Sequence, residues 1–395
     1  MLSECRLEDA VVESINQSGD GSMNKYVRRI ISAVLSFAIT VSFAACAQGE
    51  RPQPMMEINL PFEETIRANG AGASFPAPLY QSWFRNLNSK EPQLQFNFQS
   101  TGSGTGIERF TQGVVDFAAS DIAMTDEQVA KVSRGVLLLP MTAGSIVLAY
   151  NIPGVEELKL SRENYTDILL GRITNWSDPK LAETNPGAKL PNQKITVVHR
   201  SDGSGTTAVF TKHLSDISLE WQQTIGSATT VQWPSGSGKT FLGGRGNEGV
   251  TALVSQTPGA IGYMEYGFAS KGGLKMATLQ NKAGKFVVPG NESGSAALAS
   301  VELPENLRVF ITDPPGDDAY PIVTYTWMML YKKYDDPNKA IAMEAMVQYC
   351  LTDGQKQASP LGYIELPPEV VKQVATAADQ ISPDFSITIS EAKTS

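Results

Sequence analysis

The hydrophobic positions of the chain fall into short apolar runs, separated by segments in which apolar residues recur with helical spacing. β-branched or alternating runs predict strands at residues 94–98, 114–119, 146–150, 195–198 and 322–330. Helical spacing predicts helices at residues 79–84, 164–170, 340–350 and 370–381. This alternation is typical of α/β folds with parallel sheets, in which ligands bind beyond the carboxyl ends of the strands.

A glycine-rich turn at residues 199–207 follows a predicted strand and precedes a segment of helical spacing. Its glycines allow the backbone to approach a ligand closely, and the following helix offers unpaired N–H groups with partial positive charge. Ser204, Thr206 and Thr207 add hydroxyl donors, and Arg200 adds a fixed cation. The turn therefore predicts an anion site built mostly from neutral donors.

A second turn with the same Gly-Ser-Gly-Thr pattern, at residues 101–106, also lies between a predicted strand and a helical segment. Turns of this composition are common at strand–helix junctions, so either turn alone is a weak signal. The pair predicts two lobes that face one ligand.

Length and charge limit the class of protein. The chain has 395 residues, of which 42% are hydrophobic, and this is enough for two domains with substantial cores. Its formal net charge is −9 at pH 7, which argues against a nucleic-acid partner and against a polybasic membrane-binding surface. An anion would bind against this overall charge, so the local donors must supply the affinity.

The first part of the chain has the pattern of an export signal. Residues 23–45 contain a basic start, an apolar run too short to span a bilayer and small residues before Cys46. This resembles a bacterial lipoprotein signal with Cys46 as the lipidation site, and plain signal-peptide cleavage is the alternative. We expect residues 1–22 to be a dispensable or untranslated leader, and the polar, proline-containing residues 46–67 to be a tether. After export only Cys350 remains, as a buried helix residue rather than part of a disulfide.

Several longer motifs follow one another along the body of the chain. They lie at residues 71–78, 117–121, 151–154, 170–176, 200–206, 258–263 and 320–322. As an ordered set, over most of the chain from residue 68 onward, they resemble the phosphate-binding proteins of Pst-type ABC transporters. The resemblance implies a two-lobed periplasmic-binding-protein fold of the class II type, each lobe a mixed or parallel sheet flanked by helices, with a cleft between the lobes. Lobe I would comprise residues 68–141 and 322–395 and lobe II residues 142–321, with crossings near Met141 and Pro321.

The resemblance also implies which groups bind phosphate in the cleft. The first lobe would contribute the Ser74 hydroxyl, the Phe75 amide and Ser103. The second lobe would contribute Arg200, Ser204, and the backbone and side-chain donors of Gly205 and Thr206. Asp202 would hold Arg200 in place through a bidentate ion pair.

Asp121 would discriminate between anions. A carboxylate that faces an oxyanion is repulsive unless the anion donates a proton to it. Monohydrogen and dihydrogen phosphate carry such a proton, and sulfate at neutral pH does not. The alternative is that Ser120 and Asp121 merely cap the helix predicted near residues 125–127.

The implied function is to bind inorganic phosphate outside the cytoplasmic membrane, in the periplasm, and to deliver it to the membrane permease subunits of an ABC transporter. The protein would be a monomer without catalytic residues, cofactor or metal, and would contact the membrane only through a lipid on Cys46. One alternative is an exported phosphoesterase or other hydrolase with Ser204 or Ser103 as nucleophile. His199 and His213 are the only histidines, and no cluster has metal-ligand spacing. A phosphate sensor or scavenger that is not coupled to transport is the other alternative.

The chain departs from the family pattern at residues 236–249, where the glycine-rich loop is longer and its role is left open. Gly238, Lys239 and Thr240 imitate the end of a nucleotide-binding P-loop. The first glycine of that motif would fall on Trp233, so we reject nucleotide binding.

Overall fold

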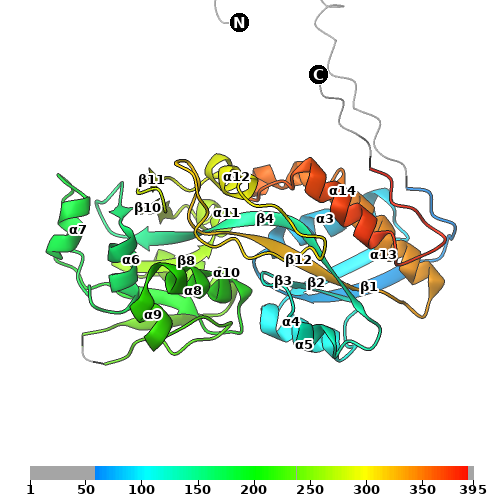
Figure 1. Cartoon of the computed structure of the whole chain (residues 1–395), viewed down its shortest axis with the longest axis horizontal. Coiled ribbons are helices and arrows are strands. Elements are labelled where there is room, and N and C mark those ends of the chain that lie inside the picture. The colour runs from blue at the N-terminus through cyan, green and yellow to red at the C-terminus, as the bar shows by residue number, and fades with distance from the viewer. Residues whose placement is uncertain (1–57, 237, 390–395) are drawn as a thin grey trace, which may run out of the picture. The chain divides into compact units, whose positions relative to one another are not determined.

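The computed structural model describes residues 58–236 and 238–389 (Figure 1). The predicted leader, the signal peptide at residues 23–45 and Cys46 lie outside the described residues. The predicted tether is described only from residue 58, and strand β1 (Ile66–Gly72) begins before its expected end at residue 67. The strand starts there because Ile66 is buried and pairs with Leu94 of the neighbouring strand.

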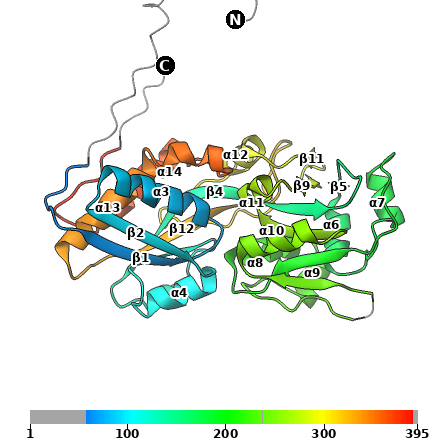
Figure 2. The ribbon, with the colours of Figure 1, turned by 180° about the vertical axis from the view of Figure 1, so that it is seen from behind.

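One mixed sheet forms the frame of both lobes. In the first lobe its strands run in the order β2 (Leu94–Ser100), β1, β3 (Phe117–Ser120), β12 (Val323–Tyr331) and β4 (Val136–Asn151). β1 is parallel to β2 and β3, whereas β12 is antiparallel to β3 and β4. Figure 2 shows the helix α3 lying over β2. The helices of this lobe are α3 (Ala77–Lys90), α4 (Ser103–Thr111), α5 (Asp126–Val129), α13 (Pro337–Leu351) and α14 (Pro368–Ala378), with 3-10 turns at Gln355–Gln357 and Ser359–Leu361.

In the second lobe the sheet continues from β4 to β8 (Ala260–Glu265), β6 (Thr196–Arg200) and β7 (Phe241–Gly244), and β9 (Lys275–Met276) also pairs with β4. β6 is parallel to β7 and β8. A small separate sheet contains β11 (Phe286–Val287), β10 (Thr278–Gln280) and β5 (Lys159–Leu160). The helices of this lobe are α6 (Arg162–Leu169), α7 (Pro179–Thr184), α8 (Gly205–Ile217), α9 (Leu219–Thr224), α10 (Gly246–Gln256) and α11 (Tyr266–Lys271). A further helix, α12 (Asn291–Ala299), contacts β4 and β12.

The long strand β4 belongs to both lobes. It pairs with β12 as far as Ser145 and with β8 from Ile146 onward, and it is buried along its length except at its last residue. The protein therefore has the two-lobed α/β fold that the sequence predicts. The lobe limits predicted near Met141 and Pro321 stay a prediction. The pairing of β4 changes between Ser145 and Ile146, and β12 begins at Val323.

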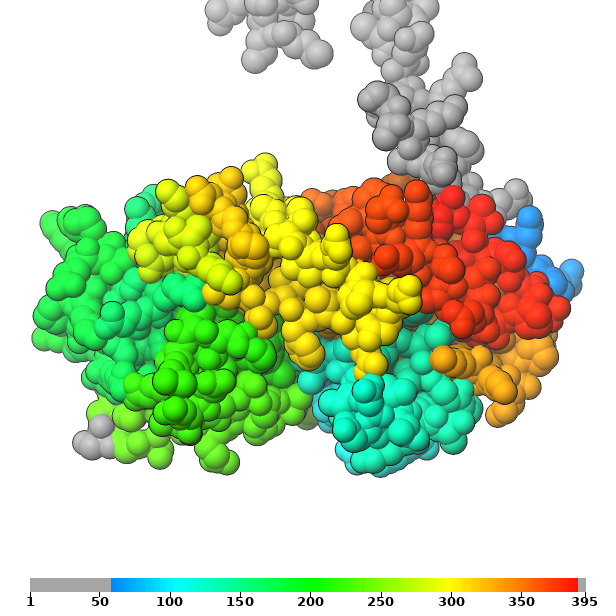
Figure 3. Space-filling model, viewed as in Figure 1, coloured from blue at the N-terminus to red at the C-terminus, as the bar shows by residue number. Residues whose placement is uncertain are grey.

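The segment after α12 crosses from one lobe to the other, and Figure 3 shows its yellow atoms over the boundary. At one end, Arg308 Nη1 lies 2.7 Å from Oδ1 of Asp126 in α5. At the other end, Asp313 accepts two hydrogen bonds from the Arg162 guanidinium of α6, at 2.5 and 2.8 Å. The segment is therefore anchored to both lobes by ion pairs.

Most predicted elements are present, with ends that differ for local reasons. The strand predicted at residues 114–119 begins only at Phe117, because Val114 is 65% exposed and pairs with no neighbour in the sheet. The strand predicted at residues 146–150 is the end of the much longer β4. No helix in the described part of the chain has both the length and the apolar character that crossing a bilayer requires.

Candidate functional site

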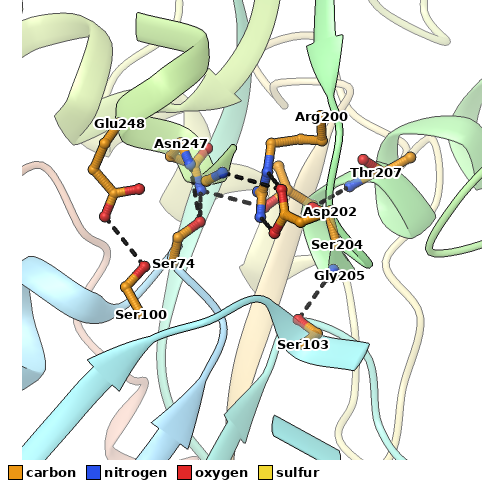
Figure 4. A network of polar contacts seen from close by, with 12 residues as sticks. Ser74, Ser100, Ser103, Arg200, Asp202, Ser204, Gly205, Thr207, Asn247 and Glu248 are labelled. Carbon is orange, nitrogen blue, oxygen red and sulfur yellow. Dashed lines mark hydrogen bonds and ion pairs between the residues drawn. The ribbon is translucent and has the colours of Figure 1, made fainter. Parts of the chain in front are cut away.

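The two glycine-rich turns meet at the boundary between the lobes. Gly104 donates its backbone N–H to the Gly203 carbonyl at 3.0 Å. The Gly205 N–H donates to Ser103 Oγ, also at 3.0 Å (Figure 4). Both turns stand at carboxyl ends of sheet strands, where ligands of α/β folds bind. The two turns therefore contact each other directly, and the expectation that they face one ligand from two lobes stays a prediction.

On the first lobe, Ser74 and Phe75 lie between β1 and α3. Ser74 is 1% exposed, and its Oγ accepts hydrogen bonds from the backbone N–H and the Nδ2 of Asn247, at 3.0 and 2.8 Å. The Phe75 ring is buried, and the Phe75 carbonyl accepts a hydrogen bond from the Tyr363 hydroxyl at 2.7 Å. This packing fixes the backbone of the turn at the place where the sequence predicts an amide donor.

Asp121 is a buried carboxylate at the end of β3, with 1% exposure. Its Oδ2 accepts a hydrogen bond from the Thr206 hydroxyl of the other lobe and its Oδ1 accepts one from Thr326 of β12, both at 3.0 Å. Burial raises the pKa of Asp121 to about 6, although the Thr206 hydroxyl, the charge of Arg200 and the Thr326 hydroxyl act in the opposite direction. The N-cap of α5 is Thr125, so the alternative in which Asp121 caps this helix is wrong.

Arg200 ends β6 and supplies the cation of the site. Its Nε and Nη2 donate to the two carboxylate oxygens of Asp202, at 2.8 and 2.6 Å, and its Nη1 lies 3.3 Å from Thr206 Oγ1. Burial alone would raise the pKa of Asp202, but the Arg200 guanidinium and the N–H of Gly246 lower it below its ordinary value. The bidentate pair holds the guanidinium plane in one orientation.

The start of α8 carries the remaining predicted residues, Ser204, Gly205 and Thr206. Ser204 is the N-cap of the helix, and its Oγ accepts the Thr207 N–H at 3.1 Å. The Gly205 N–H has no carbonyl partner within the helix, and it points out of the N-terminus toward Ser103 Oγ. The structure thus brings all nine predicted site residues into the region where the two lobes touch.

Two residues that the sequence motifs do not single out also belong to this network. Asn247, in the first turn of α10, contacts both Ser74 and Thr206, and Thr326 donates to Asp121. A signal existed for Asn247, because it lies in a third glycine-rich turn between a strand and a helix. Thr326 has no such signal, because it stands within the apolar run of β12.

The two histidines make contacts elsewhere. His199 Nδ1 lies 2.8 Å from the Arg200 carbonyl, its ring stacks on Trp233, and burial lowers its pKa. His213 Nε2 lies 2.9 Å from the Tyr165 hydroxyl. Within residues 58–236 and 238–389, no group of three His, Cys, Asp or Glu side chains is placed to hold a metal ion.

The chemistry of the site follows from this set of groups. Hydroxyl and amide donors surround one guanidinium, a combination that binds a compact anion. The buried Asp121 carboxylate is an acceptor among these donors. An anion that carries a proton could donate it to this carboxylate.

A family model, that of the PBP superfamily domain, matches residues 61–353. The chain therefore belongs to this class of binding proteins, in agreement with its fold. Phosphate-binding protein PstS of Pasteurella multocida is 40% identical over 309 residues, which cover 77% of this chain and 88% of the relative. Phosphate-binding protein PstS of Methanocaldococcus jannaschii is 36% identical over 392 residues, which cover 93% of this chain and 100% of the relative. The chain therefore belongs to the PstS family of phosphate-binding proteins, as its motifs indicate.

Solved structures show the same fold at lower sequence identity. A high-affinity periplasmic phosphate-binding protein with bound phosphate has a TM-score of 0.66 and 19% identity, covering 79% of this chain and 93% of that chain. A putative phosphate ABC transporter substrate-binding protein from Clostridium perfringens, also with bound phosphate, has a TM-score of 0.56 and 17% identity, covering 76% of this chain and 100% of that chain.

Proposed function

We propose that this protein binds inorganic phosphate outside the cytoplasmic membrane and delivers it to the permease subunits of an ABC transporter. The names of its relatives and the family it belongs to support this function. In this proposal residues 23–45 direct export. The phosphate-binding groups are Ser74, Phe75, Ser103, Asp121, Arg200, Ser204, Gly205 and Thr206, with Asp202 behind Arg200.

The observation that carries the proposal is the buried carboxylate among the anion-binding donors. Asp121 lies within hydrogen-bond distance of Thr206, which itself contacts the guanidinium of Arg200. A fully ionised anion such as sulfate would leave Asp121 facing like charge in a place that excludes water. Phosphate carries a proton near neutral pH and can donate it to Asp121, so the arrangement favours phosphate.

Contacts between the lobes suggest how binding is coupled to movement. Gly205 bonds to Ser103 and Thr206 bonds to Asp121, and each pair joins one lobe to the other. A phosphate ion between the turns would accept from the donors and donate to the carboxylate, so it would hold both lobes at once. Closure then presents one arrangement of the two lobes to the permease.

The contacts of the serines do not favour the hydrolase alternative. Ser103 Oγ accepts the N–H groups of Gly205 and Asp121, at 3.0 and 3.4 Å, and Ser204 Oγ accepts that of Thr207. A nucleophilic serine needs a base at its hydroxyl, whereas the hydrogen bonds of His199 and His213 go to Arg200 and Tyr165.

Calorimetric titration of the purified protein, freed of bound phosphate, tests the function. We expect one-to-one phosphate binding that persists in excess sulfate. The same preparation should not hydrolyse a chromogenic phosphate ester. Absence of heat with phosphate would contradict the proposal, and turnover of the ester would support the hydrolase instead.

Asp121→Asn tests the role of the carboxylate. The amide lacks the negative charge and can donate a hydrogen bond, so we expect sulfate to compete markedly better, while phosphate affinity falls less than sulfate affinity rises. Competition titrations with both anions measure this. Asp335→Asn is the control, because this carboxylate is exposed in the turn before α13. An equal change for both anions would contradict the role of Asp121.

A further inference from the structure

Asn247 lies between the two lobes in the first turn of α10, and its side chain is fully buried. Its orientation is fixed by the backbone, because its Oδ1 accepts the N–H of Glu265 at 3.0 Å. The amide nitrogen must therefore point the other way, as a donor. Nδ2 lies 2.8 Å from Ser74 Oγ and 3.5 Å from Thr206 Oγ1.

These contacts determine how the Ser74 hydroxyl can be used. A hydroxyl has one proton to donate and two lone pairs that accept. Both lone pairs of Ser74 are engaged by Asn247, one by its backbone N–H at 3.0 Å and the other by its Nδ2 (Figure 4). Only the proton of Ser74 is left for another partner, so Ser74 can act toward a ligand as a donor alone.

Thr206 is constrained in the same way. Its Oγ1 lies 3.3 Å from Nη1 of Arg200 and 3.5 Å from Nδ2 of Asn247, two groups that can only donate. The Thr206 proton then goes to Asp121 Oδ2 at 3.0 Å. Asn247 thus contacts two hydroxyls from different lobes, and its contacts leave the Ser74 proton for a further partner and the Thr206 proton for Asp121.

The first turn of α10 is also tied to the cation and to the rim of the first lobe. The Gly246 N–H donates to Asp202 Oδ1 at 3.0 Å, and this is the carboxylate that orients Arg200. Glu248 accepts the Ser100 hydroxyl at 3.2 Å. The position of Asn247 is therefore coupled both to Arg200 and to the contact between the lobes.

We propose that Asn247 is a positioning residue that fixes the Ser74 hydroxyl as a donor toward the ligand and the Thr206 hydroxyl as a donor toward Asp121, and so adapts the cleft to an acceptor-rich anion held by both lobes. This role rests on the proposed phosphate binding and assigns a specific task to the third glycine-rich turn. Asn247 acts on the ligand through the Ser74 hydroxyl, and on Asp121 through the Thr206 hydroxyl.

The chain offers a matched control in Asn151. This asparagine also stabilises α10, but at the other end, where its Nδ2 donates to the carbonyls of Val254 and Ser255 at 3.1 and 2.8 Å. Asn151→Ala loosens the same helix without touching Ser74 or Thr206. A merely structural role of Asn247 would therefore be matched by this variant.

The experiment measures phosphate affinity and dissociation rate for wild type, Asn247→Ala, Asn151→Ala, Ser74→Ala and the double variant Asn247→Ala with Ser74→Ala. We expect Asn247→Ala to weaken binding about tenfold, mostly through faster dissociation, and Asn151→Ala to leave it near wild type. Because Asn247 acts partly through Ser74, the double variant should lose clearly less than the product of the two single losses.

Asn247→Asp provides a second test, because aspartate has the same size and shape as asparagine. Its carboxylate can still accept the Glu265 N–H, but it replaces the donor with an acceptor, so the Ser74 proton would turn toward it and away from the anion. We expect a larger loss than in Asn247→Ala. Equal effects of Asn247→Ala and Asn151→Ala, or fully multiplicative losses with Ser74→Ala, would overturn the role of Asn247. A wild-type protein that does not bind phosphate would instead overturn the proposed function, and this role with it.

Discussion

At the scale of single residues, the unusual group is a carboxylate buried among donors. An isolated buried charge is costly, and Asp121 is stabilised by hydroxyls from both lobes and by the nearby charge of Arg200. Burial nevertheless dominates, because the pKa of Asp121 rises to about 6. In an unfolded chain an aspartate has a pKa of about 3.9. Between these two values the folded protein holds a proton that the unfolded chain has released.

This difference makes stability depend on pH. A pKa that is raised in the folded state adds to the stability of the protein at low pH. This contribution is complete below the pKa of the unfolded chain, and it is lost as the pH rises through about 6. Asp121→Asn removes the titration, so without ligand we expect the variant to be more stable than wild type at pH 8, by up to about 3 kcal/mol. The advantage should vanish near pH 4.

Urea unfolding in phosphate-free buffers at several pH values measures this advantage. Buried acids whose raised pKa does not depend on Asp121, such as Glu344, titrate in the same way in both proteins, so their effects cancel in the comparison. An advantage of Asp121→Asn that is the same at every pH would contradict the shifted pKa.

The candidate site residues that belong to local motifs could be predicted from the sequence. Those that tertiary packing brings to the site from distant parts of the chain could not. Asp121 and Arg200 stand at strand ends beside recognisable turns. Thr326 reaches Asp121 from β12, which is distant along the chain, and nothing in an apolar strand marks one threonine. Asn247 could be suspected from its glycine-rich turn, but the direction of its amide depends on the N–H of Glu265.

At the scale of elements, the turns decide how closely the lobes can approach. A side chain at Gly205, in the first turn of α8, would come within 2.5 Å of Ser103 Oγ and 2.8 Å of Asp121 Cβ. A side chain at Gly104, in the first turn of α4, would meet the Gly203 backbone only at ordinary contact distance, 3.5 Å. Both glycines face the other lobe. Gly205 has no room for a methyl group, whereas Gly104 has.

We therefore expect Gly205→Ala to keep the lobes apart and to weaken phosphate binding. Overpacking of this kind costs about 1–3 kcal/mol, which corresponds to roughly a fivefold to 150-fold loss of affinity. Gly104→Ala should bind almost as wild type, because alanine is the better helix former and fits the space. Titration calorimetry compares the two variants. Similar affinities for both would show that the approach of the turns does not limit binding.

The elements themselves were predictable where their pattern is regular, and β1 shows where the pattern fails. Its sequence contains glycines, and a side chain at Gly70 would lie 2.3 Å from the ring of Phe117. The strand exists because that ring packs onto the bare backbone, a tertiary contact that periodicity does not reveal. The sequence pattern predicts only the last part of β4, at residues 146–150, for a related reason. A strand that is buried on both faces lacks the alternation of polar and apolar residues that marks the ends of a half-exposed strand.

At the scale of the whole described unit, the lobes are joined by more than a hinge. β4 pairs with β12 on one side and continues to β8 on the other. The segment after α12 is anchored to one lobe through Arg308 and to the other through Asp313. One continuous cluster of buried apolar side chains includes Trp83 of the first lobe and Trp176 of the second. The lobes therefore share much of their stabilisation.

Unfolding should then be a single cooperative event, although the protein has two lobes. We expect scanning calorimetry to show one transition, which phosphate shifts upward as a whole. A ligand at a hundred times its dissociation constant adds about 2.7 kcal/mol to the stability of the folded state. Gly205→Ala, in which the turns cannot meet, should show a much smaller shift, and sulfate should produce little shift in wild type. Two separate transitions, with phosphate acting on only one of them, would mean that the shared strands do not couple the lobes. Binding would then stabilise one lobe, whereas a site built from Ser74, Asp121 and Arg200 requires both.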